Sequence, residues 1–179
     1  MHVWHPRAKR VLFEDAGDFV EPFNPKIIWH TTEGQTIDGA VAAYRANGGD
    51  CPHFTIEPHN FSRKLYQHIR LDRASRSLRH PSGTPETNRA GCIQIEIVGF
   101  TADIRKMTRR QYRWLYWLAR WIEQNAHVHR AAYHPFPDNP GYHRLSPDGF
   151  PTARGHLGHC HVPNNDHMDP GNIIIGRIL

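Results

Sequence analysis

Residues 92–100, CIQIEIVGF, constrain the possible fold of this chain more than any other segment. Aliphatic side chains occupy every second position of this run, at Ile93, Ile95 and Ile97. A period of two residues is typical of a β-strand whose two faces have different surroundings. We therefore expect the isoleucine face to pack on a core, while the other face carries Gln94 and Glu96.

Three more strands are predicted from short apolar or alternating runs: KIIWH at 26–30, HFTIEP at 53–58 and KLYQHIR at 64–70. The run at 26–30 is almost entirely apolar, as in a strand buried on both faces. The other two are separated by a turn near Asn60 and therefore predict a β-hairpin.

Two helices are predicted, one over 36–47 and one over 108–126. Thr36 can cap the first, and Thr108 with Gln111 fits a capping box at the start of the second. Apolar residues in the second recur at helical spacing, at Leu115, Leu118, Trp121 and Ile122. This stripe predicts a helix packed on a core rather than a ligand site.

Together these elements predict an α/β fold: one domain with a central mixed β-sheet flanked by helices. We expect residues 1–25 to form an irregular N-terminal lead-in and residues 26–179 to form the domain. Polar residues at 71–91 predict a surface loop that borders a substrate groove. A proline-rich stretch at 133–157 is predicted to be a binding loop.

Composition indicates a globular protein without membrane insertion. The chain has 179 residues, is 39% hydrophobic, and contains no apolar run long enough to cross a bilayer. Its first residues, MHVWHPRAKRVLFED, lack the apolar core and cleavage site of a signal peptide. We therefore expect a cytoplasmic location on synthesis, so that action outside the cytoplasm would need another route.

The chain carries a net charge of +5, which favours a polyanionic partner. Nucleic acid is one candidate, and a bacterial cell wall with acidic peptides and teichoic or teichuronic polymers is another. No standard nucleic-acid motif is present, so we expect no nucleic-acid partner. The one basic cluster, at Arg105, Lys106, Arg109 and Arg110, is most simply a solvated helix face.

Three cysteines, Cys51, Cys92 and Cys160, do not form a disulfide framework, because their number is odd and no CxxC pair exists. We expect buried free thiols, with at most one bridge.

Histidines are unusually frequent, with 15 in the chain, and they gather in GHCHVPNNDHMDPG at 158–171. Zinc in a catalytic site takes three protein ligands, commonly histidine nitrogen or carboxylate oxygen, and keeps one position open. His30, at the end of a predicted strand, can be the first ligand, with His159 and Asp169 as the second and third. On the residues alone, Cys160, His161 or His167 could ligate instead.

Four segments, in order, give the chain a family resemblance: WHTTEG, CPHFTIEP with KLYQHIRLDRASRSL, CIQIEIVGF, and GHCHVPNNDHMDPG. Over residues 26–172 the chain resembles the zinc-dependent N-acetylmuramoyl-L-alanine amidases of the amidase-2 type. This family includes peptidoglycan recognition proteins and bacteriophage lysins. The resemblance implies hydrolysis of the amide bond between N-acetylmuramic acid and L-alanine, with peptidoglycan or a muropeptide as substrate.

The resemblance also implies residue roles. His30, His159 and Asp169 become the ligands of Zn²⁺. Glu96 becomes the acid/base residue that activates water and protonates the leaving amine. His167 polarises the amide carbonyl and stabilises the oxyanion. Cys160 is not promoted to a ligand, because relatives with a cysteine ligand carry it at the position of Asp169.

One part of the family pattern is missing. Some relatives have a catalytic tyrosine before the histidine of the hairpin strand, whereas Pro52 precedes His53 here. Glu96 would then carry more of the reaction. His53 itself is either a partner that orients a metal ligand or a core histidine.

Three biological settings fit the resemblance. We expect a monomeric phage-type endolysin that reaches the wall after holin-type release. A cytoplasmic amidase that recycles muropeptides is the alternative. A non-catalytic peptidoglycan-binding module is a third class, although the intact set of ligands with Glu96 argues against it.

Overall fold

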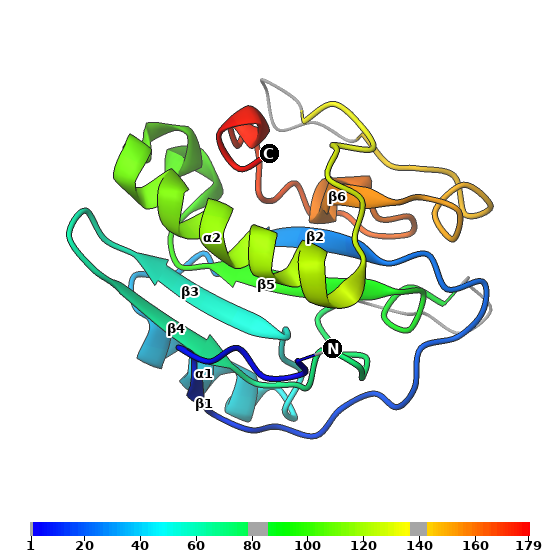
Figure 1. Cartoon of the computed structure of the whole chain (residues 1–179), viewed down its shortest axis with the longest axis horizontal. Coiled ribbons are helices and arrows are strands. Elements are labelled where there is room, and N and C mark those ends of the chain that lie inside the picture. Colours follow the sequence, from blue (N-terminus) through cyan, green and yellow to red (C-terminus); the bar gives the residue numbers. More distant parts are fainter. Residues whose placement is uncertain (1, 79–85, 137–142) are drawn as a thin grey trace.

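A computed structural model describes residues 2–78, 86–136 and 143–179. In this part of the chain one mixed six-stranded sheet runs in the order β1-β4-β3-β5-β2-β6 (Figure 1). The strands are β1 Lys9–Arg10, β2 Lys26–Thr31, β3 Phe54–Pro58, β4 Arg63–Gln67, β5 Cys92–Ile97 and β6 Gly155–Gly158. The helices are α1 Ile37–Ala46 and α2 Arg109–Ala126, with short 3-10 turns η1 Thr101–Lys106, η2 His159–His161 and η3 Ile175–Arg177. The predicted α/β fold with a mixed sheet is confirmed.

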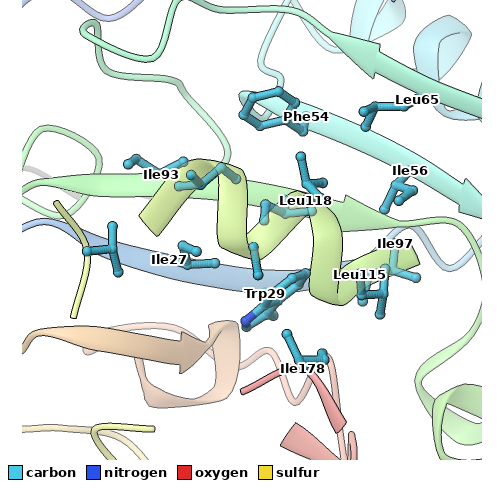
Figure 2. Close-up of a cluster of buried hydrophobic side chains, with 14 of the residues drawn as sticks. Ile27, Trp29, Phe54, Ile56, Leu65, Ile93, Ile97, Leu115, Leu118 and Ile178 are labelled. Carbon is cyan, nitrogen blue, oxygen red and sulfur yellow. The ribbon is translucent and has the colours of Figure 1, made fainter. Parts of the chain in front are cut away.

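Strand β5 lies in the middle of the sheet, parallel to both β2 and β3. Its isoleucines face α2 in the main core, as predicted from their alternation, and Figure 2 shows Ile93 and Ile97 among the aliphatic side chains beneath that helix. Gln94 and Glu96 point to the other face, because successive side chains alternate across a strand. The hairpin is confirmed too, since β3 and β4 pair antiparallel.

The two helices cover opposite faces of the sheet. Leu65 of β4 belongs to the core under α2, whereas its neighbour Tyr66 packs with Ile37 and Val41 of α1. Both predicted caps are present: Thr36 accepts a hydrogen bond from the Gly39 amide, and Thr108 and Gln111 form a capping box. The sheet therefore separates an α1 face from an α2 face.

A buried polar chain ties β6 to β2 and α2. The indole Nε1 of Trp29 donates to Nδ1 of His156 at 3.1 Å, and His156 Nε2 lies 3.0 Å from Oε1 of Glu123. His156 is fully buried and Glu123 is 6% exposed. Since Nδ1 accepts from Trp29, the proton of a neutral His156 lies on Nε2 and bonds to the carboxylate. A glutamate inside the core is thus satisfied.

The structure corrects three loop predictions. Residues 155–158 form β6 rather than the end of a loop, and β1 in the lead-in pairs with β4 at the edge of the sheet. Residues 71–91 do not form a purely surface loop, because several of their side chains are buried: Leu71, Ala74, Ser75, Leu78, Thr87 and Ala90. Residues 79–85 and 137–142 of the two predicted loops lie outside the described residues. The domain division at residue 25 stays a prediction.

All three cysteines are free and buried, as expected. No helix in the described part of the chain is long and apolar enough to span a membrane.

Because His53 and His68 are buried, we expect the folded protein to lose stability in mild acid. His53 accepts from the Gln94 amide at Nδ1 and bonds the Arg73 carbonyl through Nε2, and His68 bonds Val11 and Thr55. Burial lowers the pKa of each from 6.5 to about 4. The unfolded chain therefore binds more protons between these values, so stability falls as the pH drops from 6.5 towards 4.

The expected loss is on the order of 2–3 kcal/mol for each histidine. Urea unfolding at several pH values measures it, with His53→Gln and His68→Gln expected to flatten the dependence. An unchanged slope in both variants would contradict this assignment.

Candidate active site

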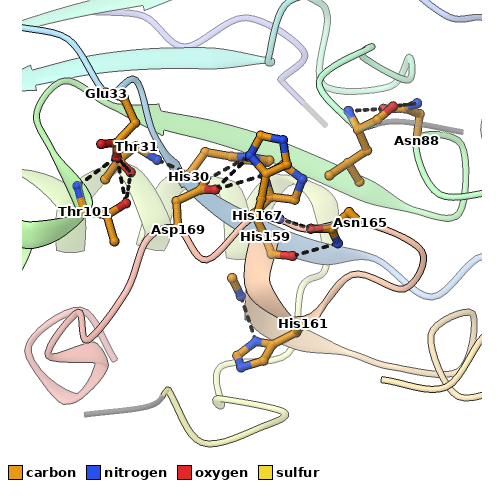
Figure 3. A network of polar contacts seen from close by, with 12 residues as sticks. His30, Thr31, Glu33, Asn88, Thr101, His159, His161, Asn165, His167 and Asp169 are labelled. Atoms are coloured by element: carbon orange, nitrogen blue, oxygen red, sulfur yellow. Dashed lines mark hydrogen bonds and ion pairs between the residues drawn. The ribbon is translucent and has the colours of Figure 1, made fainter. Parts of the chain in front are cut away.

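Three predicted metal ligands meet at the carboxyl ends of β2 and β6 (Figure 3), on the face of the sheet that α1 covers. His30 lies next to the end of β2, and His159 follows directly after β6. Parallel pairing of β2 with β6 brings these two strand ends together. Asp169 arrives from the loop after η2 and is anchored by the Thr31 amide, which donates to Oδ2 at 3.3 Å.

The three side chains point their polar atoms at one another. Nδ1 of His30 lies 3.1 Å from Nδ1 of His159, and the Asp169 carboxylate lies 3.4 Å from the first nitrogen and 3.2 Å from the second. One potential ligand atom from each residue lies within 4.8 Å of the others, and all three residues are buried. The arrangement matches the two-histidine, one-carboxylate set that suits zinc.

The electrostatics of Asp169 and His159 also fit metal binding, whereas the pKa of His30 is raised, because the Asp169 and Glu96 carboxyl groups outweigh its burial. Burial opposes charge on Asp169, but hydrogen bonds from His159, His167 and His30 hold its pKa well below the usual range. Burial and the nearby His30 lower the pKa of His159 to about 4. A carboxylate and a neutral imidazole are the protonation states that ligate metal ions. The Nε2 atoms of His30 and His159 have no hydrogen-bond partner in the described residues.

Glu96 faces the three ligands from β5. It is the direct register partner of His30 across the β2–β5 pair and lies on the same face of the sheet. Its Oε2 is enclosed and has no hydrogen-bond partner among the described residues. Burial raises the pKa of Glu96 to about 7, against the lowering effect of His30. A carboxyl group with this pKa can take up and release a proton near neutral pH.

His167 lies at the open side of the triad. Its ring stacks on His159 with centroids 4.2 Å apart, and its Nδ1 lies 3.5 Å from Oδ1 of Asp169. Unlike the three ligands, its side chain is 45% exposed. The structure therefore brings all five predicted site residues together, with His167 accessible from solvent.

A pocket of about 430 Å³ opens beside this cluster. The sequence did not predict its far wall, which is formed by Ala40, Ala43 and Tyr44 of α1, by Asn47 just after that helix and by Ser77. The Tyr44 hydroxyl lies 3.1 Å from Thr55 Oγ1, so α1 brings a tyrosine to the pocket although Pro52 offers none. No sequence signal distinguished Tyr44 from an ordinary residue on the packed side of a helix.

The structure gives the surroundings of His161 and Cys160, two of the alternative ligands, and of His53. His161 is engaged at both ring nitrogens, by the Gly158 amide and the Pro135 carbonyl. Cys160 is buried outside the cluster, and burial raises the pKa of its thiol to about 12. The ring of His53 bonds only to backbone groups of Arg73 and Gln94 among the described residues, so it is a core histidine.

Fold and site together define an α/β protein whose candidate metal centre faces a buried carboxyl group with a raised pKa. The sequence model of one family, N-acetylmuramoyl-L-alanine amidase (Amidase_2), matches residues 23–172. The chain belongs to this family and is an N-acetylmuramoyl-L-alanine amidase, an enzyme of peptidoglycan hydrolysis. No curated sequence matches the chain.

Solved structures of similar fold cover nearly the whole chain. N-acetylmuramoyl-L-alanine amidase LysC from Clostridium intestinale is 15% identical with a TM-score of 0.58, over 97% of this chain and 95% of that one. A selenomethionine derivative of AmpD is 17% identical with a TM-score of 0.57, over 99% and 96%. Staphylococcus aureus hydrolase AmiA is 14% identical with a TM-score of 0.55, over 94% and 74%. These likenesses extend the shared fold to the lead-in before residue 23.

Metal affinity tests the ligand set. We expect His159→Ala and Asp169→Asn to weaken Zn²⁺ binding by more than roughly 100-fold, beyond the loss typical of removing an outer hydrogen-bond partner. Isothermal titration of the metal-free protein measures this. Cys160→Ala and the exposed Asp166→Asn serve as controls from the same segment and should bind Zn²⁺ normally. Equal losses in the controls would mean that the segment, rather than the ligand set, was disturbed.

Proposed function

We propose that the chain is a zinc-dependent amidase in which His30, His159 and Asp169 hold the metal and Glu96 is the acid/base residue. The observation that carries this proposal is the position of Glu96: its carboxyl group faces the three candidate ligands from the adjacent strand, with its pKa raised into the neutral range. The scissile bond is the amide between the lactyl group of N-acetylmuramic acid and L-alanine.

The protein groups then divide the reaction between them. Glu96, as a carboxylate, takes a proton from the attacking water. His167 donates a hydrogen bond to the carbonyl oxygen, where negative charge develops in the tetrahedral intermediate. Glu96 returns the proton to the nitrogen of L-alanine, and the peptide leaves as an amine. Zinc, when bound, would polarise the carbonyl and make water more acidic.

Orientation of the ligands follows from the fold. Asp169 is held by the Thr31 amide on β2, next to His30. Trp29 lies on the other face of the same strand and bonds to His156 of β6, two residues before the terminal Gly158. The polar chain in the core therefore sets the register of the two strands that present His30 and His159.

Replacing Glu96 separates catalysis from metal binding. Glu96→Gln keeps the size of the side chain but removes the proton acceptor, so kcat should fall by about 10²–10⁴-fold. Zinc content, measured by atomic emission, should stay at the wild-type value. Glu14→Gln changes an exposed carboxylate outside the site and should leave both unchanged. Wild-type turnover in Glu96→Gln would remove Glu96 from the mechanism.

Mass spectrometry of digested peptidoglycan tests the bond that is cleaved. We expect free peptides that begin with L-alanine beside intact glycan strands, with loss of activity in chelator and recovery on adding Zn²⁺. Shortened glycan strands or peptides cut internally would contradict the assigned bond. Sacculi that are bound but not cleaved would favour the binding-module alternative.

For the biological setting we propose a phage-type endolysin, supported by the net charge of +5, which favours an anionic wall. A muropeptide-recycling amidase differs in its preferred substrate. Faster hydrolysis of intact sacculi than of soluble muropeptides, at equal stem-peptide concentration, fits the lysin. The reverse preference fits recycling.

A further inference from the structure

The outer surface of α2 carries a second groove of about 610 Å³, within the size range of ligand sites. It lies between this helix and η3, which Figure 1 shows beside the beginning of α2. We name it the α2 groove and define it by its lining: Arg109, Tyr112, Arg113, Tyr116, Trp117 and Arg177. None of these residues lines the pocket of the active site.

Positive charge in the α2 groove is not neutralised. Arg109, Arg113 and Arg177 are exposed, and none of them forms an ion pair within the described residues. The only acidic residue of α2 is Glu123, which is buried and already bound by Arg120 and His156.

The arginines at the beginning of α2 are not explained by a contribution to the stability of the helix. The first turn of α2 contains no acidic residue and begins with Arg109 and Arg110, with Arg113 one turn later. Cations at this end oppose the helix dipole, which favours acidic side chains there. The arginines therefore weaken the helix slightly, and an anionic ligand would relieve their mutual repulsion.

Aromatic rings form the walls between these charges. The guanidinium group of Arg177 lies 5.2 Å from the centroid of the Tyr112 ring, which holds it over the groove. Trp117 is 46% exposed and packs edge-on against Trp114, with centroids 5.0 Å apart. Planar guanidinium groups match phosphate geometry, and a fixed indole face offers an apolar surface for a sugar ring.

The α2 groove and the active site lie on opposite faces of the sheet. Ile95 of β5 points to the core under α2, whereas the adjacent Glu96 points to the metal ligands. The same alternation along β2 directs Trp29 to α2 and His30 to the site. A polymer held in the α2 groove would therefore leave the catalytic pocket open.

We propose that the α2 groove binds a phosphate-bearing glycan polymer of the bacterial wall, distinct from the peptidoglycan strand that is cleaved. This inference rests on the proposed lysin setting, in which the substrate of the enzyme lies in that wall and the two ligands occur together. Insertion into a lipid surface needs a broad apolar face, and Trp117 is the only large hydrophobic residue of the groove with substantial exposure. Binding at the α2 groove would retain the enzyme on the wall between hydrolytic events.

Direct binding tests this proposal without using catalysis. The probe is a soluble glycosylated polyol-phosphate polymer purified from cell walls, and its affinity is measured by biolayer interferometry. The combined variant Arg109→Gln, Arg113→Gln, Arg177→Gln should bind at least tenfold more weakly than the wild type. Trp117→Ala should weaken binding to this polymer but not to inorganic polyphosphate, which carries charge without sugar rings.

A matched control removes the same number of charges from the edge strand β1 and its approach, by Arg7→Gln, Lys9→Gln and Arg10→Gln. This variant should bind the polymer within twofold of the wild type. Hydrolysis of a small soluble muropeptide should be unchanged in both combined variants, which shows that the fold and the active site are intact. Failure of the amidase reaction itself would be visible in the wild type and would not affect the binding measurement.

Three results would overturn the proposal: no binding of the polymer by the wild type, an equal loss of affinity in the β1 control, or equal binding of sacculi before and after chemical removal of their phosphate polymers. Single-stranded DNA and anionic phosphatidylglycerol vesicles are the competing probes. Tighter binding of either one, lost in the α2 groove variant but not in the β1 control, would assign the groove to that ligand instead.

Discussion

The parallel pairing of β2 with β5 is the constraint on which the site depends. It places His30 directly opposite Glu96. The alternate side chains of both strands, which point to the other face, pack in the core under α2. A slip of one residue would turn Glu96 into the apolar core and expose an isoleucine at the candidate metal site. Core packing and catalytic geometry are therefore held by the same register, so the sheet cannot shift without a large loss of apolar burial.

Burial sets the chemistry of the cluster as much as proximity does. Asp169 stays ionised because three histidines and a backbone amide surround it, whereas Glu96 has no hydrogen-bond donor to Oε2 in the described residues and keeps a raised pKa. The two carboxyl groups lie in one cavity, but their pKa values are shifted in opposite directions because their partners differ. One is suited to hold a cation and the other to move a proton.

The sequence predicted the central sheet and both helices, and the five residues that it proposed for the site lie together in the structure. Strong signals carried these predictions: alternation in β5, the capping box of α2, and the order of motifs around His30, Glu96 and Asp169. β6 was not predicted, because GHLG is too short to show the two-residue alternation of a strand and is bounded by glycines. Only its pairing with β2 identifies it as a strand.

The position of Tyr44 at the pocket and the presence of the α2 groove could not be predicted from the sequence for another reason. Tyr44 lies at helical spacing with the packed residues of α1, and only the tertiary structure shows that its hydroxyl reaches the pocket beside Thr55. Arg177 is far from α2 in sequence, and η3 alone brings it over Tyr112. Contacts between distant segments leave no local pattern for the sequence to reveal.

The distance along the chain between the clustered residues also has a consequence for biosynthesis. His30 and Glu96 are 66 positions apart (96 − 30), and Asp169 follows 73 positions after Glu96 (169 − 96). Such non-local contacts form late and slowly, because large loops must close before they contribute. A nascent chain cannot complete the candidate metal site until residue 169 has left the ribosome and its loop has docked. A chain that ends before residue 169 therefore lacks one of the clustered groups, so the cluster is completed only near the end of synthesis.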